Sequence, residues 1–271
     1  MREYFEFLED EFIASKVENL NLKTLLERGE ITLYRRKKEN GSLYFVQTSG
    51  DFMDSRVQQT LLETTTIALR RSLKSLGIKR GDLVMVVGVG NGEMIADSLG
   101  PRVVSQVSVS AHLNLKRFKG NLCAFSSGVK TGTGVESFEV TKALVKSLRP
   151  KAVIAVDTLA SSTIERLGNL VQIKNGELTP GAGVGNQKKT LEYSTLGVPV
   201  IGVGVPLIIH AKNIVLNYLN ESEEKVLFPL LKRITGNLDV TAKEIDLYVS
   251  IYSKIIAMAI NRSVHGISIK A

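Results

Sequence analysis

The stretch LVMVVGVGNGEMIADSLGP, at residues 83–101, decides the fold that this sequence predicts. Its first seven residues form a continuous apolar run, which is typical of a strand buried on both faces of a parallel sheet. Three glycines, Gly88, Gly90 and Gly92, permit a tight turn that leads the chain to Asp97. We therefore expect Asp97 to lie at the carboxyl edge of a central strand, where open α/β sheets place their reactive groups.

A second apolar run, KAVIAVDTLAS at residues 151–161, brings Asp157 to the end of another strand. Both acidic residues should therefore emerge at the same edge of the sheet. Two carboxylates brought together cannot both ionise cheaply, so one tends to hold a proton while the other acts as a base. This arrangement predicts the activation of a water molecule.

Further apolar runs alternate with amphipathic segments along the chain, which is the α/β pattern. These runs are LCAF at 122–125, LVQI at 170–173 and PVIGVGV at 199–205. We predict an α/β fold with an open, twisted, mostly parallel sheet and helices on both faces. A helix is expected at 57–76, where leucines recur at helical spacing and Gly77 supplies a stop.

The two ends of the chain complete this prediction. The C-terminal segment opens with TAKE at 241–244, the spacing of a capping box, and continues as a long amphipathic helix. Residues 1–56 predict an N-terminal appendage with a candidate regulatory role, attached to an α/β domain at 57–271. In the appendage, the segment up to Gly29 is acidic with a helical pattern, and residues 31–48 have the pattern of a basic β-hairpin.

Composition favours a globular protein of the cytoplasm. Of the 271 residues 44% are hydrophobic, and the single cysteine excludes an intramolecular disulfide. The chain lacks the basic start and apolar core of a secretory signal, and no apolar run approaches the roughly 18 residues of a membrane-spanning helix. A net charge of +8 attracts nucleic acids, membranes and acidic proteins alike, so it selects none of these partners.

Local patterns argue against several other functions. The densest basic run, RRKK at 35–38, is interpreted as the solvated tip of the hairpin, and no recognised nucleic-acid module is present. We expect no direct contact with nucleic acid or membrane. Cys123 lies in an apolar run, which is typical of a buried, inert thiol. The loop at 88–92 lacks the full GxGxxG spacing, so it does not predict dinucleotide binding.

Two further glycine-rich loops are candidate oxyanion sites. TGTG at 131–134 precedes a predicted helix, and PGAGVGN at 180–186 is too rich in glycine for an ordinary turn. Backbone N–H groups in such loops can stabilise the negative charge that develops on a carbonyl oxygen. The candidate residues are Gly132, Gly134, Gly181, Gly183, Gly185 and Asn186.

Several separate segments, in order, make the chain resemble the germination protease family over residues 57–265. They are GVGNGEMIADSLGP, GVKTGTGVES, AVIAVDTLAS, TPGAGVGNQKKTLEYSTLGVPVIGVGVP and DVTAKEID with SKIIAMAINRSVH. The resemblance implies an endopeptidase of the cytoplasm or spore core that degrades small acid-soluble spore proteins during germination. It also implies a zymogen with a removable propeptide and a homo-oligomer, and it places the two essential aspartates at Asp97 and Asp157.

A more distant likeness to hydrogenase maturation peptidases leaves a metal alternative open. In those proteins the positions of Asp97 and Asp157 resemble metal ligands, and His112 is a third candidate ligand here. We otherwise expect no cofactor. A second alternative is a catalytically silent relative that uses the crevice as a binding module. The chain departs from the usual proline, arginine and aspartate of the germination protease pattern at Ala96, Ser162 and His210.

Overall fold

The computed structural model describes residues 22–38, 41–113, 120–179, 189–236 and 238–266. At the centre of this described part is a mixed, nine-stranded sheet. Its parallel strands are β10 (Val200–His210), β6 (Ala152–Ser161), β4 (Leu83–Val89) and β5 (Asn121–Gly128). Its antiparallel strands are β1 (Lys23–Arg28), β2 (Ile31–Lys38), β3 (Gly41–Thr48), β7 (Leu170–Asn175) and β11 (Asp239–Thr241).

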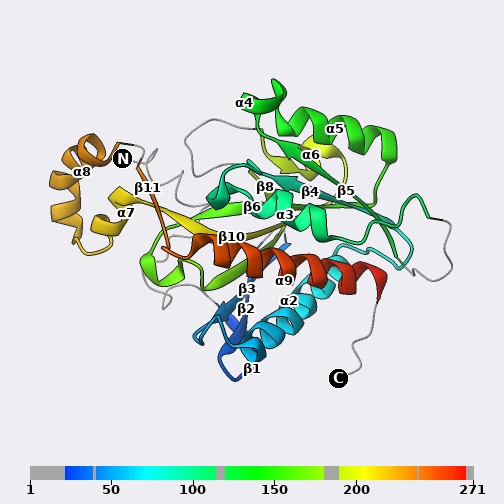
Figure 1. The fold of residues 1–271 in the computed structure, drawn as a ribbon, viewed down its shortest axis with the longest axis horizontal. Coiled ribbons are helices and arrows are strands. Elements are labelled where there is room, and N and C mark those ends of the chain that lie inside the picture. Colours follow the sequence, from blue (N-terminus) through cyan, green and yellow to red (C-terminus); the bar gives the residue numbers. More distant parts are fainter. Residues whose placement is uncertain (1–21, 39–40, 114–119, 180–188, 237, 267–271) are drawn as a thin grey trace.

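The strands follow the order β1-β2-β3-β7-β10-β6-β4-β5, with β11 paired to β10 beside that path (Figure 1). A small second sheet, formed by β8 (Glu177–Leu178) and β9 (Leu191–Glu192), lies against β10. The predicted α/β open sheet is confirmed, and each apolar run quoted above lies in a strand to within one residue at its start. The sheet is mixed rather than mostly parallel, because the strands before residue 57, β7 and β11 pair in the antiparallel sense. The two runs that carry the fold prediction, β4 and β6, are parallel neighbours.

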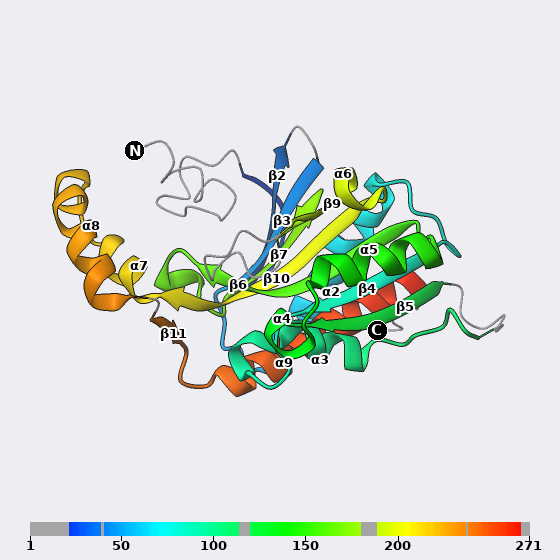
Figure 2. The same cartoon turned by 90° about the horizontal axis from the view of Figure 1, so that it is seen from above.

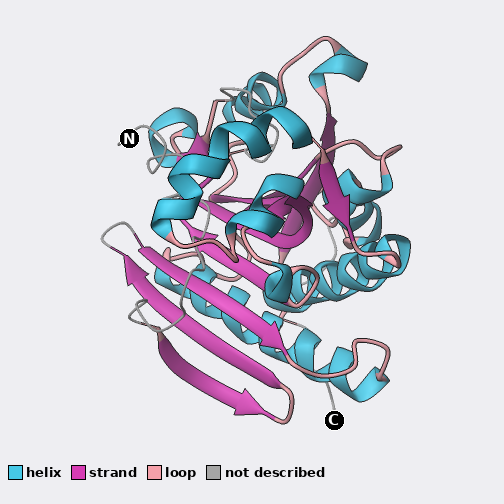
Figure 3. Cartoon of the chain, turned by 90° about the vertical axis from the view of Figure 1, so that its left-hand side faces the viewer, coloured by secondary structure: helices cyan, strands magenta, loops and turns pink. Residues whose placement is uncertain are grey.

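Helices cover both faces of the sheet, as predicted (Figures 2 and 3). α2 (Ser55–Ser75), α3 (Leu99–Gln106) and α9 (Ile245–His265) pack on one face, and α5 (Ser137–Leu148) and α6 (Tyr193–Leu196) pack on the other. Ile154 and Val156 of β6 join the first core, whereas Val153 and Ala155 join the second. This double burial explains the continuous apolar run. Among the described helices, none combines the length and the apolar character that crossing a bilayer requires.

Two local predictions are wrong. The helical pattern expected up to Gly29 fails at Lys23–Arg28, which forms β1, and its earlier part at 1–21 lies outside the described residues. Thr241 does not cap the C-terminal helix, because it ends β11, and Glu244 precedes α9 without a side-chain capping bond. In both places, pairing with a neighbouring strand outweighs the local helix signal.

The basic hairpin at 31–48 is present as β2 and β3, and it belongs to the main sheet. On its other side β3 pairs with β7, where Val46 lies opposite Val171. The sheet therefore extends across residue 56, where we placed the domain boundary. The division into 1–56 and 57–271, and the regulatory role of the first part, stay predictions.

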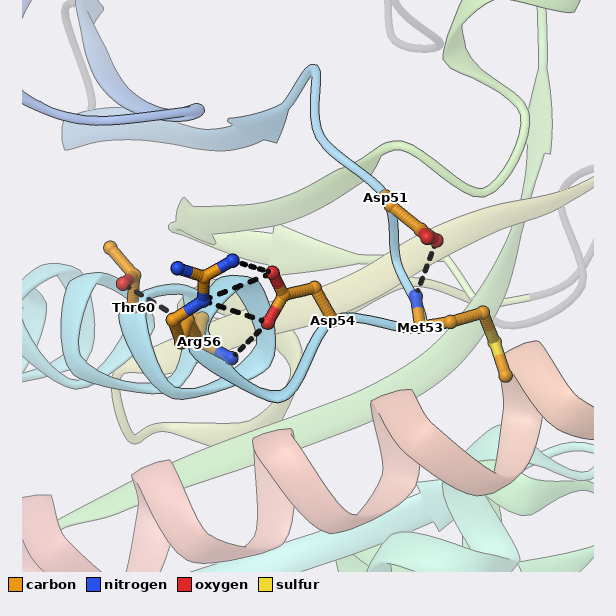
Figure 4. A network of polar contacts seen from close by, with 5 residues as sticks. All are labelled: Asp51, Met53, Asp54, Arg56 and Thr60. Carbon is orange, nitrogen blue, oxygen red and sulfur yellow. Dashed lines mark hydrogen bonds and ion pairs between the residues drawn. The ribbon is translucent and has the colours of Figure 1, made fainter.

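The helix expected at 57–76 is confirmed as α2, and polar contacts define its start (Figure 4). The Asp54 carboxylate accepts the backbone N–H of Arg56 at 2.8 Å and pairs with the guanidinium of the same residue, also at 2.8 Å. The guanidinium and then the backbone N–H lower the pKa of Asp54, so this N-cap is charged at neutral pH. At the other end Gly77, with a φ of 73°, supplies the expected left-handed stop.

Tyr252 fixes α9 in the core. Its buried hydroxyl donates a hydrogen bond to the Gly168 carbonyl at 2.6 Å, and its ring stacks on Phe52 with centroids 4.5 Å apart. Burial raises the pKa of Tyr252, so the hydroxyl stays protonated and remains a donor. One residue of α9 thus contacts both the segment before α2 and the connection between β6 and β7.

An arm projects from one end of the sheet (Figures 1 and 2). It consists of α7 (Ala211–Leu216) and α8 (Glu221–Thr235), and these two helices pack on each other. No α8 residue whose exposure is described is buried. Its apolar side chains therefore lack the cover that other described helices receive from the sheet.

Arg149 ends α5 with φ and ψ both at 51°, and its N–H donates to the Val145 carbonyl at 2.9 Å. Within the described ranges it is the one residue other than glycine with a positive φ. Its Cβ crowds the backbone in this left-handed conformation, whereas glycine adopts it freely.

We therefore expect Arg149→Gly to raise the free energy of unfolding by about 1 kcal/mol. Urea unfolding curves measure this change. Arg149→Ala keeps the Cβ and is the matched control, which should give no such gain. A glycine variant no more stable than the alanine variant would show that this backbone is unstrained.

Candidate active site

Two glycines bring helix α3 into direct contact with the sheet. A Cβ atom on Gly88 of β4 would lie 2.4 Å from the carbonyl oxygen of Gly100 in α3. A Cβ atom on Gly100 would lie 2.3 Å from the Val89 carbonyl oxygen and 2.5 Å from that of Val156. The start of α3 therefore rests on the backbones of β4 and β6, which only residues without side chains permit.

This packing places Asp97 over the carboxyl ends of those strands. Asp97 ends the short 3₁₀-helix η2 (Ile95–Asp97), which lies against β6. Its half-buried carboxylate accepts the Asn91 N–H at 2.8 Å, so it folds back over the turn that leaves β4. Asp97 does not cap α3, because Ser98 occupies the N-cap position of that helix.

Asp157 lies in the neighbouring strand at the same edge. It follows Val156, which is paired with Gly88 of β4, and it is itself paired with Gly204 of β10. Its side chain is only 2% exposed, and Oδ1 accepts the N–H of Thr158 at 2.9 Å. Gly204 has no side chain, and the side chain of Leu159 occupies the space beside it. A Cβ atom on Gly204 would lie only 2.5 Å from the Cγ of Leu159.

The structure thus brings the two sequence-distant acids to one edge of the sheet. Asp97 arrives through the glycine turn and η2, and Asp157 arrives along β6. One carboxylate is half-buried and the other is buried, so their surroundings are unequal. Such a pair can share a proton and a water molecule. Their catalytic role stays a prediction.

Sequence reasoning missed two residues that position Asp97. Gly100 supports the whole segment by its contact with β4 and β6, and Asn91 supplies the backbone N–H that the carboxylate accepts. The signal for Gly100 was a glycine in the first turn of a helix, where it is unfavourable without a packing reason. No sequence signal identified the donor, because any residue other than proline has an N–H.

The candidate oxyanion residues have different outcomes. Gly132 lies in α4 (Lys130–Thr133) and Gly134 ends it, and their N–H groups donate to the carbonyls of Val129 and Lys130 at 3.0 and 2.7 Å. The helical turn uses both N–H groups, so the predicted oxyanion role is not supported there. The other four candidates lie outside the described residues: Gly181, Gly183, Gly185 and Asn186.

The other polar candidates lie apart from the two acids. Among the described residues, no group of three metal-binding side chains is present, and His112 is exposed, so Asp97, Asp157 and His112 do not form a ligand set. His265 is buried, and its Nε2 donates to the Ser108 carbonyl at 2.8 Å. Cys123 is half-buried, and burial raises the pKa of its thiol, which fits an inert residue.

Gly90 is the position where a substitution should disturb Asp97 directly. Its φ is 111°, and an added Cβ would lie 2.1 Å from the Asp97 carbonyl oxygen. We expect Gly90→Ala to lower the free energy of unfolding by about 1–3 kcal/mol, because strain and a backbone clash combine. Gly134→Ala is the control, since its φ is 74° but an added Cβ meets no atom within 4 Å. Equal losses in urea unfolding would contradict a specific contact at Gly90.

Comparison with known proteins places the chain in a family. The family model described as germination protease matches residues 11–221. A germination protease of Caldanaerobacter subterraneus is 36% identical over 217 residues, which cover 68% of this chain and 66% of that relative. One of Clostridium acetobutylicum is 30% identical over 282 residues, with 92% and 86% covered, and one of Bacillus subtilis is 35% identical over 167 residues, with 59% and 45% covered. The chain thus spans just under two thirds of the length of the first of these relatives. The extent of these matches shows that the chain belongs to the germination protease family.

Proposed function

We propose that this protein is an endopeptidase that uses Asp97 and Asp157 to activate water. The observation that supports the proposal is that Asp157 ends the apolar part of β6 and Asp97 follows the turn that leaves the neighbouring strand β4, both on the carboxyl side of these strands. Membership of the germination protease family supports a peptidase. We further propose that its substrates are small acid-soluble spore proteins and that it acts in the cytoplasm or spore core, from a zymogen form.

The chemistry follows from one ionised and one protonated carboxyl group. The carboxylate removes a proton from water as the water oxygen attacks the scissile carbonyl carbon. The protonated carboxyl donates a hydrogen bond to the carbonyl oxygen, and a proton later reaches the amine that leaves when the C–N bond breaks. In this proposal Gly132 and Gly134 have no oxyanion role, whereas Gly181, Gly183, Gly185 and Asn186 remain candidates.

We expect Asp97→Asn and Asp157→Asn each to lower kcat/KM by about 10²–10⁴, because each removes an ionisable group while keeping its shape. Cleavage of a small acid-soluble spore protein is the assay. Asp246→Asn, an exposed aspartate in the first turn of α9, is the matched control and should retain full activity.

Two outcomes of this assay separate the alternatives. Activity that survives both substitutions would remove the aspartate pair from the mechanism. No cleavage by the wild-type protein would favour a binding module. A chelator added to the same assay tests the metal alternative, which loss of activity and rescue by a divalent ion would support.

We also propose that the protein is a homo-oligomer and that α8 pairs with α8 of a second copy. Val226 is 76% exposed, Leu230 41% and Ile234 70%, and their four-residue spacing puts them on one face of the helix. Such a contiguous exposed apolar face is unusual for a monomer.

The charges of α8 favour a second copy as the partner. Glu223 and Glu224 lie near its start, and Lys232 and Arg233 lie near its end. In an antiparallel pair related by a two-fold axis, the acidic half of each helix faces the basic half of the other.

We expect the double change Val226→Glu and Ile234→Glu to produce monomers, because it places charge in the apolar face. Sedimentation velocity measures the mass, and Lys225→Glu, an exposed position next to that face, is the control. A double variant with the mass of the wild type would exclude α8 as the contact.

A further inference from the structure

A basic hollow lies at the amino edge of the sheet, opposite the two acids. It has a volume of about 610 Å³ and lies between the end of α5, the start of β6 and the segment from α6 to β10. Four cationic side chains line it: Lys142, Lys146, Arg149 and Lys151. Its other lining residues include the buried apolar Val145, Pro150 and Leu196. We name these residues together the basic hollow.

Among the residues that the structure describes, no carboxylate lines the basic hollow. In the part of the chain that the structure describes, none of its four cations forms an ion pair. On the adjoining elements, Glu139 forms its ion pair with Lys189 at 2.6 Å, and Glu192 takes part in the capping box of α6. The hydrogen bond from Lys189 lowers the pKa of Glu139, and the charge of Lys142 also helps to lower it. The negative end of a helix dipole favours one or two cations nearby. Four cations around one hollow exceed what the end of α5 requires.

The backbone of Arg149 is a second and independent sign of function. A left-handed helix end suits glycine, yet here the position is occupied by Arg149, which lines the basic hollow. Strained backbone conformations concentrate at ligand-binding sites. Arginine at this position also adds a planar set of donors that matches phosphate oxygens better than a lysine does.

We propose that the basic hollow binds phosphate groups, presented by the backbone of a nucleic acid. Lys and Arg side chains supply most of the contacts that proteins make to such backbones. Tyr193, which is 64% exposed at the same hollow, offers a ring on which a base can stack. The sequence alone predicts no contact with nucleic acid, because the basic run at 35–38 fits the solvated tip of a hairpin. The cations of the basic hollow come from separate segments of the chain, and only the fold brings them together.

The basic hollow and the acid pair are separate sites. Lys151 precedes Asp157 by six residues of extended chain, which span about 20 Å. A bound backbone would therefore leave the carboxyl edge open. The inference goes beyond the proposed peptidase activity, and its test does not require cleavage of any substrate.

The test measures binding to a labelled DNA duplex and to a labelled single strand of the same length by fluorescence anisotropy, and binding of pyrophosphate by isothermal titration calorimetry. We expect the triple change Lys142→Gln, Lys146→Gln and Lys151→Gln to weaken duplex binding at least about ten-fold. It should also reduce the slope of log affinity against log salt by about 3, since each phosphate contact contributes close to one unit. The triple change Arg35→Gln, Arg36→Gln and Lys37→Gln removes the same charge from β2 and should have little effect.

A second variant separates binding from stability. Arg149→Gly should weaken binding while the melting temperature stays the same or rises, so a loss cannot be attributed to unfolding. Binding of pyrophosphate alone, with the same dependence on the lysines, would support the site and assign it to a small phosphate compound. No binding of either probe, or equal losses in both triple variants, would overturn the proposal.

Discussion

The contact between the backbones of α3, β4 and β6 is the constraint on which the candidate site depends. Gly88 and Gly100 let the start of the helix rest on two strands, and added Cβ atoms there would meet carbonyl oxygens at 2.3–2.5 Å. Because Gly100 follows Asp97 by three residues and contacts Val156, the same packing sets where both acids lie. The geometry of the site is thus a property of the core, which is rigid because it is closely packed.

Much of this arrangement could be predicted from the sequence, because strands that are buried on both faces have continuous apolar sequences. LVMVVGV and AVIAVD identified β4 and β6. Asp157 ends the second run, and the glycine turn after the first run leads to Asp97. The parallel direction of β4 and β6 is the direction that the α/β pattern predicts. The close approach of Gly100 to β4 and β6 could not be predicted, since a single glycine in a helix does not indicate which residues pack against it.

Predictions failed where long-range pairing or turn chemistry decided the outcome. Asp239–Thr241 pairs with Ile208–His210, so the capping-box spacing at Thr241 has no helix to cap. The N–H groups of Gly132 and Gly134 close a helical turn with the carbonyls of Val129 and Lys130, because backbone donors require an acceptor. The basic hollow could not be predicted from the sequence, because its cations come from the end of a helix and the start of a strand, and only the fold brings them together.

The central claim is that Asp97 and Asp157 act as one unit on a shared proton. Carbon-13 NMR titration of the aspartate carboxyl groups tests it most directly, with Asp157→Asn as the comparison. Groups that interact ionise in coupled steps, so the account predicts that the titration of Asp97 changes when Asp157 loses its ionisable proton. An Asp97 signal that titrates identically in both proteins would contradict it.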